Sequence, residues 1–215
     1  MLSFAYGFTS AQDMTNRPPD HSGDPIMPFD HFDFLAPFYE KVIPPAAIES
    51  MLRELDPSPN CRLLDAGGGT GRVSGYLQDQ VGSVVLTDIS MGMLREAAEK
   101  DGLQPACALT EKMPFAADFF DCVLLVDALH HVIDQAETAR ELWRIVKPGG
   151  RIVIQEPDIR TFPVKLIAIG EKLALMRSHF LAPQAIGDLF PFEGADVDVH
   201  SEALNAWVVV KKAMR

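Results

Sequence analysis

The stretch Cys61–Val73 constrains the fold more strongly than any other part of this 215-residue chain. A short apolar run ends in Asp65, and glycine then occupies four of the five positions from 67 to 71. Apolar residues follow at the spacing of a helix face, at Val73, Tyr76, Leu77 and Val81. Since glycine-rich segments between apolar runs form turns, the stretch predicts a strand, a tight turn and a helix.

Three of these glycines, Gly67, Gly69 and Gly71, keep the turn free of side chains, so a ligand can lie on its backbone. Asp65 only accepts hydrogen bonds when ionised, and therefore suits a ligand that carries an ammonium group. Dinucleotide-binding turns have the order G-x-G-x-x-G and hold a phosphate at the helix N-terminus. The order D-x-G-x-G-x-G found here argues against a pyrophosphate ligand, and a purely structural turn is the alternative.

A second strand is expected at Ser83–Asp88, and it also ends in an acid. Ser90 is expected to cap the next helix, which carries an apolar side formed by Met91, Leu94 and Ala97. A carboxylate at the end of this strand can accept both ribose hydroxyls of an adenosine. Asp88 is therefore a predicted ligand-binding residue, unless it merely flanks the helix cap.

Further apolar or alternating runs predict strands over residues 104–109, 121–126, 151–156, 195–202 and 206–210. Asp134 and Glu137 form a capping-box-like start of a helix, which includes Val146 and ends at 147–150. The segment Phe162–Phe180 is more apolar than one buried helix face requires. We expect this helix to line a pocket for an apolar ligand, or else to be buried on all sides.

The glycine stretch resembles motif I of the class I S-adenosylmethionine-dependent methyltransferases. The segments Phe120–His131 and Leu142–Glu156 resemble motifs II and III of the same family, in the correct order. The chain resembles most the subgroup of small-molecule methyltransferases of ubiquinone/menaquinone biosynthesis. The resemblance implies an α/β fold with a Rossmann-like, seven-stranded and mostly parallel sheet. Its strand order would be 3-2-1-4-5-7-6, with strand 7 antiparallel and helices on both faces.

The resemblance also implies S-adenosyl-L-methionine as the cofactor and S-adenosyl-L-homocysteine as the product. The cofactor-binding residues that it suggests are Tyr39, Asp65, Gly67, Gly69, Gly71, Asp88, Ile89, Thr110, Glu111 and Asp127. Tyr39 belongs to the pattern Phe32-Asp33-x-x-Ala36-x-x-Tyr39-Glu40. In the family, the tyrosine of this pattern lies near the methionine end of the cofactor. The alternative is that Tyr39 is only an aromatic residue of the core. Leu109 occupies the position at which the family has an acid that contacts the adenine amino group. Recognition of this edge of the adenine must therefore come from Thr110, from the backbone or from water.

His130 and His131 are adjacent and point to different sides, so they do not readily serve one metal ion, and we predict no metal site. His131 is the candidate catalytic residue, as a general base or a positioning group, because an unperturbed imidazole suits proton transfer at neutral pH. A purely structural role is the alternative for His131, and it is favoured for His130.

The net charge of -11 argues against a surface that tracks nucleic-acid phosphates and leaves room only for local basic patches. Three widely spaced cysteines in or beside apolar runs indicate reduced core thiols and a cytoplasmic protein. No signal-peptide pattern and no run of membrane-spanning length is found, so membrane insertion is not expected. Residues 1–28 predict an irregular arm, and residues 29–215 a single domain with a helical cap at 29–58.

The function expected from these features is methyl transfer from S-adenosylmethionine to a small, apolar or aromatic molecule. Such a transfer depends mainly on holding the two reacting groups together, so no catalytic motif is required. A non-catalytic S-adenosylmethionine-binding subunit is one alternative, and a nicotinamide-dependent dehydrogenase is a second, less favoured one. The sequence leaves the oligomeric state open, with a homodimer among the options.

Overall fold

The computed structural model describes residues 48–173 and 178–214, without the side chains of Ile167 and of residues 170–173. Tyr39 and the expected arm over residues 1–28 lie outside the described residues, as does most of the expected cap over 29–58. The rest of that cap includes helix α2 (Ile48–Leu55), which buries Met51 and Leu55. Within the described residues, no helix is long and apolar enough to cross a membrane.

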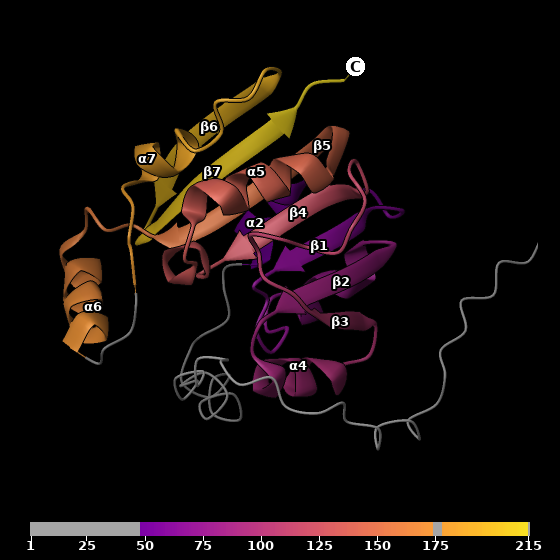
Figure 1. The fold of residues 1–215 in the computed structure, drawn as a ribbon, viewed down its shortest axis with the longest axis horizontal. Helices are drawn as coiled ribbons and strands as arrows, with labels where there is room; N and C mark the ends of the chain where they lie inside the picture. Colours follow the sequence, from indigo (N-terminus) through magenta and orange to yellow (C-terminus); the bar gives the residue numbers. More distant parts are fainter. Residues whose placement is uncertain (1–47, 174–177, 215) are drawn as a thin grey trace, which may run out of the picture.

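Seven strands of the described chain form one sheet with the order β3-β2-β1-β4-β5-β7-β6 (Figure 1). The strands are β1 (Arg62–Ala66), β2 (Ser83–Asp88), β3 (Leu103–Cys107), β4 (Phe120–Val126), β5 (Val146–Pro157), β6 (Ala195–Glu202) and β7 (Asn205–Lys212). Strands β1 to β5 are parallel, and β7 is antiparallel to both β5 and β6. The predicted fold class and strand order are confirmed.

Helices cover both faces of this sheet, as predicted. One face packs against α2, α3 (Ser74–Leu77) and α4 (Met91–Ala98), and the other against α5 (Gln135–Ile145) and α7 (Pro183–Gly187). Single-turn 3₁₀ helices follow α3 and β4, namely η1 (Gln78–Gln80) and η2 (Leu129–His131). Helix α6 (Phe162–Leu173) projects away from the sheet (Figure 1).

The central strands are apolar throughout because both of their faces are buried. Successive side chains of a strand point to opposite faces, so Leu63 and Leu124 join the core beside α2 and α4. Leu64 and Leu125 join the second core, beside α5, and all four leucines are fully buried. This two-sided burial fixes the carboxyl ends of β1, β2 and β4, from which the site is built.

Both predicted helix caps are present. The Ser90 hydroxyl accepts a hydrogen bond from the Met93 amide at 3.2 Å, at the start of α4. The Asp134 carboxylate accepts one from the Glu137 amide at 2.8 Å, at the start of α5. Each cap satisfies a backbone donor that has no partner within its helix, and so fixes where the helix begins.

Several segment boundaries differ from the sequence prediction. The strand expected over 104–109 ends at Cys107, and residues 178–180 lie outside α6, although the helix was expected to extend to Phe180. Val146, expected in the preceding helix, is extended and begins β5, so that strand starts before Lys147–Gly150 instead of after it. A register shift between Phe120 and Cys122 of β4 accommodates the extra residues of β5, and Gly149 adopts a φ of +80° there. A bulge of this kind lets glycine and proline lie within a strand, which a sequence pattern does not reveal.

Three side chains that were expected to be buried are exposed. Tyr76 is 59% exposed, because α3 is a single turn and buries only Ser74 and Leu77. Met91 is 49% exposed, and Met93 packs into the core in its place. Cys107 is an exposed thiol at the end of β3, whereas Cys61 and Cys122 are buried, as expected.

Candidate cofactor and active site

The glycine turn has the backbone geometry that the sequence predicts. Gly67 and Gly69 have φ angles of +69° and +56°, a region that residues with a branched side chain rarely adopt. A Cβ atom on Gly67 would lie 2.9 Å from the Cβ of Ala128. The backbone at Gly67–Gly69 lines a pocket at the carboxyl ends of the strands, so a ligand can lie directly on it.

Asp88 connects this turn to the next strand. Its Oδ2 accepts a hydrogen bond from the Gly69 amide at 3.0 Å, and its Oδ1 accepts one from the Ser90 amide at 2.8 Å. A carboxylate oxygen has two lone pairs and can accept from a ligand hydroxyl as well. Because Asp88 also lines the pocket, these two bonds fix the position of its carboxylate in the pocket wall.

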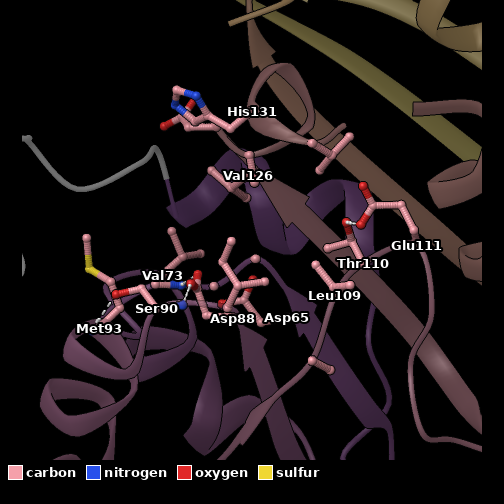
Figure 2. A pocket seen from close by; sticks show the side chains of 18 of the residues that line it. Asp65, Val73, Asp88, Ser90, Met93, Leu109, Thr110, Glu111, Val126 and His131 are labelled. Carbon is pink, nitrogen blue, oxygen red and sulfur yellow. Dashed lines mark hydrogen bonds between the residues drawn. The ribbon is translucent and has the colours of Figure 1, made fainter. Parts of the chain in front are cut away.

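Most of the predicted site residues lie on this one pocket. They come from the ends of four strands, and they are Asp65, Gly67, Gly69, Asp88, Ile89, Thr110, Glu111, Asp127 and His131. Figure 2 shows His131 across the pocket from Asp65 and Asp88, with Leu109, Thr110 and Glu111 on a third side. The pocket therefore has three distinct walls, formed by the glycine turn, by the loop after β3 and by η2.

Gly71 is not among the residues that line the pocket. It has a φ of +74°, and a Cβ atom there would lie 2.5 Å from Cδ1 of Leu103 and 3.3 Å from Cδ1 of Leu86. Gly71 thus allows the chain leading into α3 to pack closely against β2 and β3. Its role in the described pocket is structural, and it does not form part of the surface on which a ligand would lie.

Asp65 is a buried acid beneath the turn. Its side chain accepts a hydrogen bond from the Ser74 hydroxyl, and its residue is only 1% exposed. Burial raises the pKa of Asp65 to about 6, against the opposing effect of the Ser74 hydrogen bond. An ionised carboxylate in this position is stabilised by a cation, which fits the ammonium group predicted for the ligand.

A second acid, Asp127, forms an ion pair with Arg72 on the pocket wall. Nη2 of Arg72 lies 3.3 Å from Oδ2 of Asp127, whose backbone adopts the unusual φ of +49°. Burial, followed by the negative charge of Glu156, raises the pKa of Asp127 to about 6. With Asp65, these two residues offer both signs of charge, as recognition of a zwitterionic amino-acid group requires.

Arg72 is a site residue that the sequence analysis missed. Its side chain is only 10% exposed and lines the pocket. The sequence shows only a basic residue directly after the glycine turn. Such a residue at the start of a helix is ordinarily exposed on the surface, so it does not stand out as a site residue. Its partner Asp127 is 55 positions away, so only the fold brings the two together.

Thr110 and Glu111 line the pocket but are hydrogen-bonded to the protein. Oε1 of Glu111 accepts from the amides of Ile133 and Asp134 at 3.0 and 3.2 Å. The Thr110 hydroxyl lies 3.2 Å from Oε2 of Glu111 and 3.3 Å from the Thr138 hydroxyl. These contacts hold the loop before α5 against the loop after β3, and thereby close one side of the pocket.

His131 lies on η2 with its imidazole in the pocket wall. Burial, and the nearby charge of His130, lower the pKa of His131 to about 3. Its Nδ1 lies 3.4 Å from the Ser178 hydroxyl. The ring is therefore neutral at physiological pH and is a weak base, which favours a positioning role over the general-base role in the sequence-based hypothesis.

Glu156, at the end of β5, holds η2 in place, and the sequence analysis missed this role. Its Oε1 accepts from the amides of Ala128 and Leu129 at 2.9 and 2.8 Å. Its Oε2 lies 2.5 Å from Nδ1 of His130, which stacks on Phe180 with a centroid distance of 4.3 Å. His130 is thus a buried structural residue, as the alternative reading held, and His131 alone faces the pocket.

The expectation that the apolar helix after β5 lines the pocket or is wholly buried is wrong for its described side chains. Val164 is buried, but Phe162, Leu166 and Ile169 are 72%, 54% and 55% exposed. Among the described residues, those that line the pocket lie between Asp65 and Ile133. The helix projects beyond the end of β5, so its apolar composition does not report on the pocket (Figure 1).

Comparisons with known proteins agree with this fold and site. Residues 64–154 match the family described as "Methyltransferase domain". The matched segment runs from β1 to β5 and contains the glycine turn, Asp88, the loop after β3 and η2. This segment is therefore similar to methyltransferase domains, and its sheet has the strand order expected for class I S-adenosylmethionine-dependent methyltransferases.

Within that class, the chain resembles enzymes of the ubiquinone/menaquinone type. The ubiquinone/menaquinone biosynthesis C-methyltransferase UbiE of Edwardsiella ictaluri is 34% identical over 154 residues, which are 67% of this chain and 59% of that protein. The protein of the same name from Pectobacterium carotovorum is 36% identical over 107 residues, 45% of this chain and 43% of that protein. The chain spans about half the length of the curated relatives it matches.

Solved structures show the same fold at low sequence identity. The [4+2]-cyclase SpnF has a TM-score of 0.71 at 13% identity, covering 86% of this chain and 94% of that chain. A putative methyltransferase from Haloferax volcanii, solved with the activator Trm112, has a TM-score of 0.69 at 18% identity, covering 86% and 98%. Since a cyclase shares this fold, the fold alone does not define the reaction.

Proposed function

We propose that this protein transfers the methyl group of S-adenosylmethionine to a small aromatic or apolar acceptor. The observation that carries the proposal is one pocket that combines a side-chain-free glycine turn, Asp88 at the end of β2 and the charged group of Asp65, Asp127 and Arg72. Each part suits a different portion of the cofactor. The high net negative charge also supports a small acceptor over nucleic acid.

The residues present fit the cofactor. A Cβ atom on Gly69 would approach only the sulfur of Met93, at 3.8 Å, so the missing side chain leaves room for a ligand there, whereas a Cβ atom on Gly67 would clash with Ala128. Asp88 would hold the ribose hydroxyls, while Asp65, Asp127 and Arg72 would hold the amino-acid group. Two acids and one arginine offer a charged partner to both the ammonium and the carboxylate of that group.

Bound there, S-adenosylmethionine supplies a sulfonium-activated methyl group. The chain's own contribution is to orient the acceptor, exclude water and accept a hydrogen bond from it at the neutral imidazole of His131. Holding two reactants in line is equivalent to an effective concentration of about 10⁵ M or more, so positioning alone supplies several kcal/mol. A weakly basic His131 is sufficient for this mechanism, provided that the acceptor is already acidic or electron-rich.

The acceptor class follows from the pocket wall and from the relatives. Beside His131 the wall is apolar, formed by Val126, Ala128, Val132 and Ile133. Aromatic rings bind favourably to such surfaces because their burial removes apolar area from water. The names of the relatives describe C-methylation in ubiquinone and menaquinone biosynthesis, so we propose an electron-rich ring of the quinol class as the acceptor.

A non-catalytic cofactor-binding subunit is the second candidate. The low pKa of His131 favours it, since the described pocket then holds no strong general base. A nicotinamide-dependent dehydrogenase is disfavoured, because buried Asp65 lies directly under the turn where a pyrophosphate would need to approach.

Transfer of a labelled methyl group distinguishes these candidates. The protein is incubated with methyl-labelled S-adenosylmethionine and a panel of quinols, phenols and amines, and the products are separated and counted. The Gly69→Val variant is the matched control, since its pocket should not accept the cofactor. Labelled quinol or phenol products with the wild type alone support the enzyme. Cofactor binding without transfer to any acceptor supports the binding subunit.

A further inference from the structure

We infer that Leu109 makes the adenine end of the pocket indifferent to the N6 amino group, so that the protein binds N6-substituted adenosyl cofactors as well as the unmodified one. This inference rests on the proposed function, because it assumes that the pocket holds an adenosyl ligand. It adds a ligand class and a specificity-determining residue to that proposal.

The strand order places the base at the loop after β3. Strand β2 lies between β1 and β3, so Asp88 separates the glycine turn from residues 108–111. If Asp88 holds the ribose and the turn and Arg72 hold the amino-acid group, the base must extend to the other side of Asp88. Ala108, Leu109, Thr110 and Glu111 line the pocket on that side.

Recognition of the N6 amino group requires a hydrogen-bond acceptor at this end. Leu109 has none. The Glu111 carboxylate is engaged by the protein: Oε1 accepts from the amides of Ile133 and Asp134 and so has both lone pairs used, and Oε2 accepts from the Thr110 hydroxyl, which leaves one lone pair. Asp65 and Asp127 lie at the ends of β1 and β4, on the far side of β2 from this loop. Asp88 adjoins this loop, since its carbonyl oxygen accepts from the Ala108 amide at 3.1 Å, but its carboxylate accepts from the amides of Gly69 and Ser90.

The mouth of the pocket at this end is apolar and open to solvent. Ile89, Leu109 and Ile133 line the pocket and are 57%, 50% and 84% exposed. Two contacts hold the three segments together: the Cys107 thiol lies 3.9 Å from the Ile89 carbonyl oxygen, and Glu111 accepts from the Ile133 amide. An alkyl group on N6 would meet these apolar side chains and water.

The energetic consequence is weak discrimination at N6. A site that hydrogen-bonds a ligand group rejects analogues lacking it by large factors, because its own polar groups are left unpaired. An apolar, half-exposed contact rejects an added methyl group only weakly. The base is then bound by apolar contact with Ile89 and Leu109, and the N6 hydrogens stay in water.

Calorimetry with two ligands tests this inference. S-adenosylhomocysteine carries two N6 hydrogens, and its N6,N6-dimethyl derivative carries none. The wild type should bind the two ligands with affinities within about threefold of each other. Leu109→Asp supplies an acceptor, and Leu109→Ala removes the same packing without supplying one. Relative to Leu109→Ala, Leu109→Asp should bind S-adenosylhomocysteine about three- to tenfold more tightly, with no gain for the dimethyl derivative.

Each outcome of this calorimetry either supports or overturns the inference about Leu109. A wild-type preference of about tenfold or more for S-adenosylhomocysteine would show that another group reads N6, and would overturn the inference while leaving the proposed function intact. Equal gains, or no gain, for Leu109→Asp with both ligands would show that residue 109 does not face the N6 edge. Failure of the wild type to bind either ligand would reject the proposed function itself, and the inference with it.

Discussion

Replacing Asp65 by asparagine should stabilise the protein in the absence of ligand while weakening its binding of S-adenosylhomocysteine. Burial raises the pKa of Asp65 from 3.8 to about 6. A shift of this size corresponds to a cost of about 3 kcal/mol for keeping the carboxylate ionised at neutral pH. Asparagine has the shape of the protonated acid and can still accept the hydrogen bond from Ser74, but it must bury an amide NH₂ group at a cost of about 1–2 kcal/mol. We therefore expect a net gain of about 1–2 kcal/mol.

The pH dependence gives this prediction a second test. Because the folded-state pKa of Asp65 is raised, the folded protein binds more protons than the unfolded chain between the two pKa values. This carboxyl group therefore costs stability progressively as the pH rises from about 4 to about 6, and the cost is constant at higher pH. The advantage of Asp65→Asn should be full at about pH 7.5 and should reverse near pH 4, where the cost of ionisation is largely gone but the buried amide still costs about 1–2 kcal/mol.

Urea denaturation at both pH values, with and without saturating S-adenosylhomocysteine, measures these effects. Ligand should stabilise the wild type more than the variant, because only the carboxylate pairs with the ligand's ammonium group. The reasoning is refuted if ligand-free Asp65→Asn is less stable than the wild type at neutral pH, or if its gain does not shrink in acid. If the ligand stabilised both proteins equally, Asp65 would not be the partner of the ligand's ammonium group.

Four other substitutions probe the remaining parts of the site. Gly67→Val and Gly69→Val should abolish S-adenosylhomocysteine binding in calorimetry, because both positions have positive φ angles and border the ligand; full affinity in either folded variant would make the turn purely structural. His131→Ala should lower turnover by less than about tenfold, with an unchanged pH profile between about pH 5 and 8, since a pKa of about 3 keeps the ring neutral; a loss of about a hundredfold would establish a general base. Glu156→Ala should lower the free energy of unfolding by about 2–4 kcal/mol in urea denaturation, because it leaves two amides and His130 without their buried acceptor; a loss below about 0.5 kcal/mol would contradict that role.

The parts of the site that follow from local sequence were predictable. The glycine turn and Asp88 each lie directly after a short apolar strand, and the carboxyl ends of parallel strands meet at one edge of the sheet. The caps Ser90 and Asp134 act on amides only three positions away, so their role is visible within a few residues. Strand order, in contrast, came from the family resemblance, because periodicity carries no information on pairing.

The parts that depend on distant partners were not predictable. Glu156 acts on residues 27 and 28 positions before it, and in sequence it reads only as the acid that ends a strand. The low pKa of His131 results from burial in the fold, so the ordinary value was the only basis for assigning a base. The apolar helix after β5 misled for a related reason, since composition does not show which face of a helix meets another element.

The central claim is that Asp88 and the glycine turn bind the adenosyl cofactor, and titration calorimetry of S-adenosylhomocysteine with the wild type and Asp88→Ala tests it most directly. Each hydrogen bond from a ribose hydroxyl to this carboxylate should contribute about 1.5–3 kcal/mol. The wild type should therefore bind, and Asp88→Ala should bind at least about tenfold more weakly while circular dichroism shows that it remains folded. Equal affinity of the two folded proteins, or no binding by the wild type, would contradict the account.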